Sequence, residues 1–174
     1  MTITENRDPS ADNPVASFEV GIMTSHGCNV GVCIKFSMFD RSLLVTHWSN
    51  RIFKQFVDGL DQYQGTLGDS AFMFRAHRDP SLAEGLDPRH PYHTLRDEAP
   101  ELTSEEIGSA KLSTDVNVIQ CVARGATFEA RVGYSNGQTQ SIFIHEYTAL
   151  SLLGYLLDYI KAAEILTGPM GGAA

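Results

Sequence analysis

Cysteine is scarce in this sequence. Its 174 residues include only Cys28, Cys33 and Cys121, which are too few and too scattered for a disulfide framework or a four-ligand zinc site. Long hydrophobic runs are also missing, because polar residues interrupt the most apolar stretch, at 150–160. Since residues 1–15 are polar, we expect neither a signal peptide nor a membrane span. These absences predict a protein of the reducing cytoplasm.

Glycine-rich phosphate loops are absent as well. The sequence has no nucleotide-binding loop and no kinase or dinucleotide signature, so we expect no cofactor. The net charge of −8 disfavours nucleic acid at first sight, but most of the acidity lies in residues 1–15 and 69–111. The rest of the chain is close to neutral. The overall charge therefore does not decide what a binding face would contact.

Two stretches of the chain share one pattern of apolar residues. In the first, alternation predicts strands at 18–22 and 30–36, a short apolar run follows at 43–45, and an amphipathic helix begins near residue 47 and ends near 62. The second stretch repeats this order between residues 116 and 163. Five apolar positions of its helix fall 100 residues after those of the first helix. We therefore predict an internal duplication of a β-β-β-α unit.

The fold class that follows is α+β. We expect antiparallel sheet, continuous or in two parts, with one long helix packed behind each half, because one such unit leaves much apolar surface open. The predicted organisation is a disordered arm at 1–15, a first repeat at 16–68, an irregular connector with a short helix at 69–111, a second repeat at 112–166 and a flexible tail at 167–174.

The helix of the second repeat is more apolar than one packing stripe requires. A homodimer would cover the additional side, and the first helix of the same chain would be the alternative. The residues predicted for an oligomer interface are Leu152, Tyr155, Leu156 and Tyr159.

The connector is rich in proline and histidine between residues 76 and 100. A long irregular connection is typical of a functional loop or of a linker. Further along, the Thr103–Glu106 sequence before Ile107 is a capping-box signature that predicts a short helix.

The histidines between residues 76 and 100 suggest a metal site, because imidazole is a common ligand of zinc, iron and nickel. Solvated histidines are the simpler alternative. The candidate metal ligands are His77, His90 and His93.

The sheet face opposite the core carries basic residues. Strand alternation places Lys35 and Arg131 on this face at equivalent positions of the two repeats. Basic side chains attract phosphates and aromatic rings stack on bases, which is what single-stranded nucleic acid requires. The candidate nucleic-acid-binding residues are Lys35, Phe39, Arg41, Arg124, Arg131 and Tyr134.

The order of strands followed by a helix, given twice over residues 18–163, is similar in architecture to PUR-repeat and whirly-type proteins. In those proteins paired sheets bind single strands, and the resemblance implies the same role here. We nevertheless predict a non-enzymatic binding or assembly protein that engages a protein, rather than a nucleic acid, through a sheet face or the 76–100 loop. The alternatives are a single-stranded nucleic-acid-binding protein of PUR-like or whirly-like architecture and a metal-dependent enzyme that uses the loop histidines.

Overall fold

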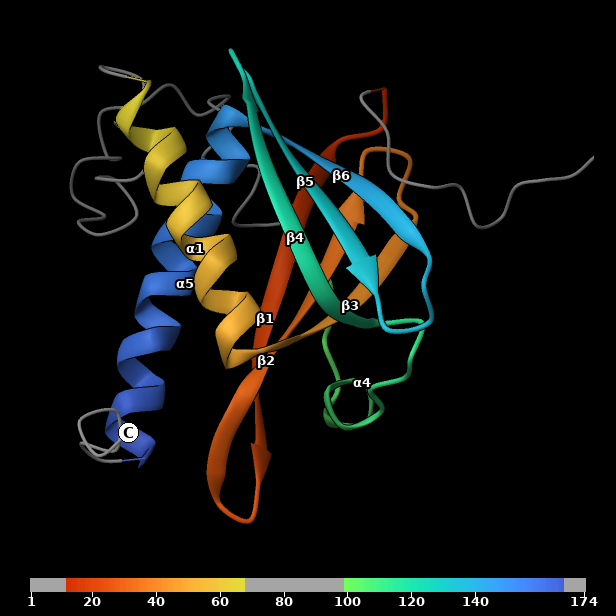
Figure 1. Ribbon diagram of the computed structural model, residues 1–174, viewed down its shortest axis with the longest axis vertical. Helices are drawn as coiled ribbons and strands as arrows, with labels where there is room; N and C mark the ends of the chain where they lie inside the picture. The colour runs from red at the N-terminus through yellow and green to blue at the C-terminus, as the bar shows by residue number, and fades with distance from the viewer. Residues whose placement is uncertain (1–11, 68–98, 168–174) are drawn as a thin grey trace, which may run out of the picture.

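Six strands and three helices make up the part of the chain that the computed structural model describes, residues 12–67 and 99–167 (Figure 1). The strands form a closed barrel in sequence order, so the mixed, mostly sheet architecture is confirmed. The strands are β1 (Val15–Ser25), β2 (Cys28–Met38), β3 (Leu43–Ser49), β4 (Asp115–Arg124), β5 (Thr127–Tyr134) and β6 (Thr139–His145). The helices are α1 (Asn50–Gly65), α4 (Ser104–Gly108) and α5 (Glu146–Thr167).

The barrel consists of two antiparallel three-stranded meanders, β1-β2-β3 and β4-β5-β6. Two short parallel pairings join them, Val15 with Ile144 and residues 47–48 with 115–116. Tight turns connect the antiparallel strands, and His26 and Gly27 both have positive φ at the first of them. Such a turn matches the right-handed twist of the paired strands. The topology thus gives each meander a face toward the core and a face toward the outside.

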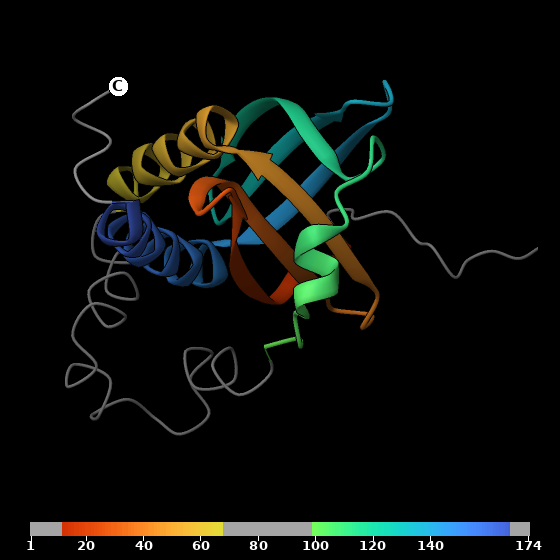
Figure 2. The ribbon, with the colours of Figure 1, turned by 90° about the horizontal axis from the view of Figure 1, so that it is seen from below.

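The helices α1 and α5 lie side by side on one flank of the barrel (Figure 2). Between them and the strands lies an aromatic core, in which Trp48 stacks on Phe56 at 4.7 Å between ring centroids and Phe128 lies 6.2 Å from Phe56. The side chains that α1 buries recur at helical spacing, as the sequence predicted. They are Ile52, Phe53, Phe56, Val57, Leu60 and Tyr63.

The short helix α4 is confirmed together with its capping box. The Thr103 hydroxyl accepts a hydrogen bond from the backbone N–H of Glu106, and the Glu106 carboxylate accepts one from the backbone N–H of Thr103. This reciprocal pair satisfies two donors that the first turn of a helix leaves open. Within the described ranges, no helix is both long and apolar enough to cross a membrane.

Candidate binding faces of the sheet

The pairing register places Lys35 and Arg131 at corresponding points of the two outer faces. Lys35 pairs with Glu19 on β1 and Val45 on β3. Arg131, likewise on the central strand of its meander, pairs with Gln120 on β4 and Ser141 on β6. Directly paired residues point to the same side of a sheet, so each cation lies in the middle of an outward row.

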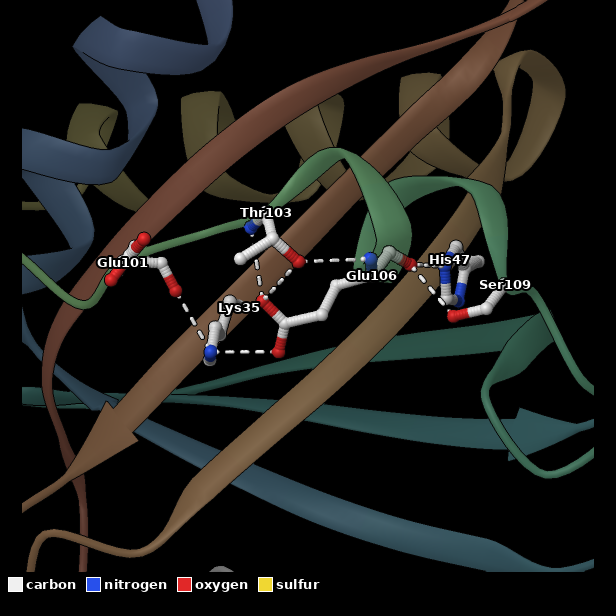
Figure 3. A network of polar contacts seen from close by, with 6 residues as sticks. All are labelled: Lys35, His47, Glu101, Thr103, Glu106 and Ser109. Atoms are coloured by element: carbon white, nitrogen blue, oxygen red, sulfur yellow. Dashed lines mark hydrogen bonds and ion pairs between the residues drawn. The ribbon is translucent and has the colours of Figure 1, made fainter.

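The outer face of β1-β2-β3 is covered by residues 99–112 of the chain itself (Figure 3). The Lys35 ammonium donates to Glu106 Oε2 at 2.7 Å and to the carbonyl oxygen of Glu101 at 2.8 Å. Beside this pair, the side chain of Ile107 lies over Gly21, where a Cβ atom would meet Ile107 Cδ1 at 2.5 Å. Lys35 is therefore only 8% exposed, although it points away from the core.

His47 fixes the same segment from β3. Its Nε2 lies 2.9 Å from the carbonyl oxygen of Glu106, and its Nδ1 lies 2.8 Å from the hydroxyl of Thr114. Because a carbonyl can only accept, Nε2 carries the proton in this network. His47 is buried, and a buried imidazole needs hydrogen-bond partners for both of its ring nitrogens. The carbonyl oxygen of Glu106 and the hydroxyl of Thr114 supply them.

The charges on the covered face alter two pKa values. The hydrogen bond from Lys35, together with that from the Thr103 backbone, lowers the pKa of Glu106 below its ordinary value. Burial, with a smaller contribution from Glu106, raises the pKa of Cys33 to about 11. The Cys33 thiol is therefore protonated near neutral pH, which makes it a poor nucleophile.

The outer face of β4-β5-β6 is open at the corresponding place. It forms a shallow hollow of about 800 Å³. Most of its side chains are amides or hydroxyls, Arg131 contributes a cation, and Val118 contributes an exposed apolar surface. The side chains that line it include Asn117, Val118, Gln120, Arg131, Tyr134, Ser135, Gln138, Thr139, Gln140 and Ser141.

Glu129 is the acid of the open face. Its carboxylate accepts hydrogen bonds from Arg124 Nε at 3.0 Å, from Arg131 Nε at 2.9 Å and from the Ser141 hydroxyl at 2.8 Å. These bonds, that of Arg131 above all, lower the pKa of Glu129, so it stays ionised although it is only 4% exposed. The Arg131 side chain remains 42% exposed.

The six candidate nucleic-acid-binding residues fall into separate places. Lys35, Phe39 and Arg41 line a second hollow of about 630 Å³ near the turn between β2 and β3. Arg131 and Tyr134 line the hollow on the other meander, where Tyr134 is only 6% exposed and its hydroxyl donates a hydrogen bond to Gln140. Arg124 lines neither of these hollows and is paired with Glu129. The structure therefore does not bring the six together into one surface.

The residues predicted for an oligomer interface lie on α5. Leu152 and Leu156 are fully buried in the core of the single chain, on a helix that contacts α1 and the barrel. Tyr155 meets Phe18 edge to face at 5.4 Å, and Tyr159 is partly buried. The homodimer stays a prediction, but the two leucines are already covered within one chain.

The covered face depends on residues that strand alternation does not reveal. Glu106 and His47 hold the segment 99–112. The capping box marked Glu106 but predicts only a helix and not where the helix docks, and His47 was not among the residues predicted from the sequence. The candidate metal ligands His77, His90 and His93 lie outside the described residues. Residues 12–67 and 99–167 contain no group of three His, Cys, Asp or Glu that could hold a metal ion.

Comparison of the chain with protein-family models, with curated proteins and with solved structures finds no match.

Proposed function

We propose that the chain is a non-enzymatic binding protein that holds a segment of another protein on the outer face of β4-β5-β6. The observation that carries this proposal is the contrast between the two faces. Residues 99–112 cover the middle of the first face through Lys35 and leave a hollow only toward the turn between β2 and β3, whereas the middle of the second face is an open hollow around Arg131. Because the three cysteines are too few and too scattered for a disulfide framework, we place this activity in the cytoplasm.

We also propose that the two faces descend from a duplicated β-β-β-α unit. Both third strands have seven residues, and a helix begins directly after each of them, at Asn50 and at Glu146. The pairs Lys35 with Val45 and Arg131 with Ser141 occupy matching points of the two meanders. This correspondence supports comparing the faces position by position.

The chemistry of the open face favours a protein over a nucleic acid. Arg124 and Arg131 share the carboxylate of Glu129, so together the three groups carry one net positive charge, whereas a run of phosphates requires several. The amides of Asn117 and Gln120 both donate and accept hydrogen bonds, as a peptide backbone requires. The Val118 side chain, 60% exposed, offers an apolar contact beside them.

Site-directed photo-crosslinking tests the proposal. A photoreactive benzoylphenylalanine replaces Gln120 on the open face, and a matched variant carries it at Asp58, on the exposed side of α1. In cells that express the full chain, we expect a discrete protein adduct from position 120 that survives nuclease and is absent at position 58. Equal adducts at both positions, or none at position 120, would contradict the proposal.

The single-stranded nucleic-acid alternative retains one favourable observation. Phe39 is 71% exposed and lines the same hollow as Arg41, so a ring and a cation lie close together there. The same experiment with the photoreactive group at Phe39 separates the two functions. An adduct at position 39 that nuclease destroys would support nucleic-acid binding at that hollow.

A further inference from the structure

We infer that the open face recognises a short acidic segment in which a carboxylate is followed closely by an aliphatic side chain. This inference rests on the proposed function and names the chemistry of its partner. Its basis is the chain itself, because residues 99–112 show how a segment of this kind covers the matching face.

The covered face shows which features such a segment uses. The Glu106 carboxylate binds the cation at the middle of the central strand, Lys35, at 2.7 Å. The next residue, Ile107, lies where Gly21 leaves room beside that cation. Side-chain recognition thus combines a charge-assisted hydrogen bond with an aliphatic contact at a site that lacks a side chain, while Lys35 and His47 add hydrogen bonds to the backbone carbonyl oxygens of Glu101 and Glu106.

Arg131 provides the corresponding cation on the open face. Its guanidinium donates to Glu129 through Nε at 2.9 Å and more weakly through Nη2 at 3.4 Å. Within the described residues the guanidinium makes no other hydrogen bond or ion pair, so its remaining N–H groups are available to a second carboxylate. Together with Arg124, Arg131 places two positive charges against the single negative charge of Glu129. An incoming carboxylate would complete the neutralisation.

Val118 and Gly133 provide the aliphatic contact. They are paired across β4 and β5, and Gly133 follows Arg131 by two residues on the same side of the sheet. Because Gly133 has no side chain, the exposed side of Val118 is open beside it. Glu129 occupies the opposite side of Arg131, so the aliphatic residue binds on the side away from the β4-β5 turn. The chemistry is that of the covered face, but the bound segment lies on the other side of the cation.

A peptide with the sequence of residues 99–112, labelled with a fluorophore, is the probe. Titrated with the full chain at low salt, it should give a saturable rise in fluorescence anisotropy. We expect Arg131→Glu in the protein, or Glu106→Gln in the peptide, to weaken binding about tenfold. Glutamine at this position preserves the capping box, so the peptide change removes only the charge. Arg51→Glu, which makes the same charge change on the exposed side of α1, should leave the affinity unchanged.

A second variant keeps the test independent of folding. Val118→Asp alters an exposed side chain, so the protein should stay folded while binding falls by a similar factor. Absence of peptide binding to the wild-type chain would overturn the inference, while crosslinking at Gln120 would still decide the proposed function. Binding that survives Arg131→Glu would place the peptide elsewhere and also overturn it. A third outcome would also overturn it: a 20-mer of oligothymidine binds the wild-type chain, the peptide does not, and Arg131→Glu abolishes the binding of the oligonucleotide.

Discussion

Gly59 is a point of close approach between α1 and the sheet, and it gives a sharp test of the packing. A Cβ atom at residue 59 would lie 2.4 Å from the Sγ atom and 2.9 Å from the Cβ atom of Cys121 on β4. The sulfur can rotate away, but the Cβ atom of Cys121 is fixed by the strand backbone. Gly59→Ala therefore requires the helix and the strand to separate.

Two opposing effects set the size of the change. Alanine is favoured over glycine inside a helix by about 1 kcal/mol. Overpacking of a close contact costs about 1–3 kcal/mol. Because both short contacts involve Cys121, we expect the overpacking to exceed the helical gain, and Gly59→Ala to lower the free energy of unfolding by about 1 kcal/mol. At Gly65, the last residue of the same helix, a methyl group would meet no atom within 4 Å, so Gly65→Ala should raise the stability by a few tenths of a kcal/mol.

Urea unfolding of the two variants, followed by circular dichroism, measures this difference. Cys121→Ala in the Gly59→Ala background removes the sulfur but keeps the Cβ atom, so it should recover only the smaller part of the loss, which a double-mutant cycle reports as a favourable coupling. If Gly59→Ala were as stabilising as Gly65→Ala, the close approach of α1 to β4 would be wrong.

Two further predictions concern the core and the ion pairs. Leu156→Ala should lower the free energy of unfolding by about 2–5 kcal/mol, because the side chain is fully buried. Light scattering of the wild type should give a mass of about twice 19.1 kDa if the predicted dimer forms. Glu106 and Glu129 have folded-state pKa values below their ordinary 4.5, so they stabilise the fold fully above that pH and lose this contribution as the pH falls through the lowered values. Urea titrations from pH 7 to pH 3 should show the loss, and Glu129→Gln should reduce it; stability that rises toward pH 3 would contradict the assignment.

Strand and turn positions were predictable because local chemistry determines them. The alternation in β2 and β5 and the glycines of the turns gave both meanders, and the Thr103–Glu106 signature gave α4. The start of α1 was less predictable. Trp48 fits both a helical and a strand period, and pairing of Gly31 with Ser49 extends β3 up to the residue before Asn50. Tertiary pairing therefore decided where the period changed.

Long-range contacts explain why the candidate site could only be predicted in part. Alternation placed Lys35 and Arg131 on outward faces, which the register confirms. Whether an outward lysine is solvated depends on a segment 71 residues away in sequence, and Glu106 covers it through a helix whose docking leaves no local pattern. The closure of the two meanders into one barrel likewise depends on a few parallel residue pairs, between β1 and β6 and between β3 and β4, which the periodicity of the sequence does not predict.

One position of the central strand accounts for the difference between the two faces. Cys33 precedes Lys35 by two residues, and Glu129 precedes Arg131 in the same way, so both point outward beside the cation. Cys33 stays neutral and Glu19, which pairs with Lys35 in register, makes no ion pair with it in the described residues, so Lys35 takes its carboxylate from Glu106. A buried lysine without such a partner would cost several kcal/mol, on the order of the penalty for an unpaired buried charge. Residues 99–112 are therefore part of the fold on that face. Glu129 already pairs with Arg131, so the open face leaves no buried charge unpaired when empty. A partner can bind there and leave without unfolding anything, which is what a binding face requires and what the covered face cannot offer.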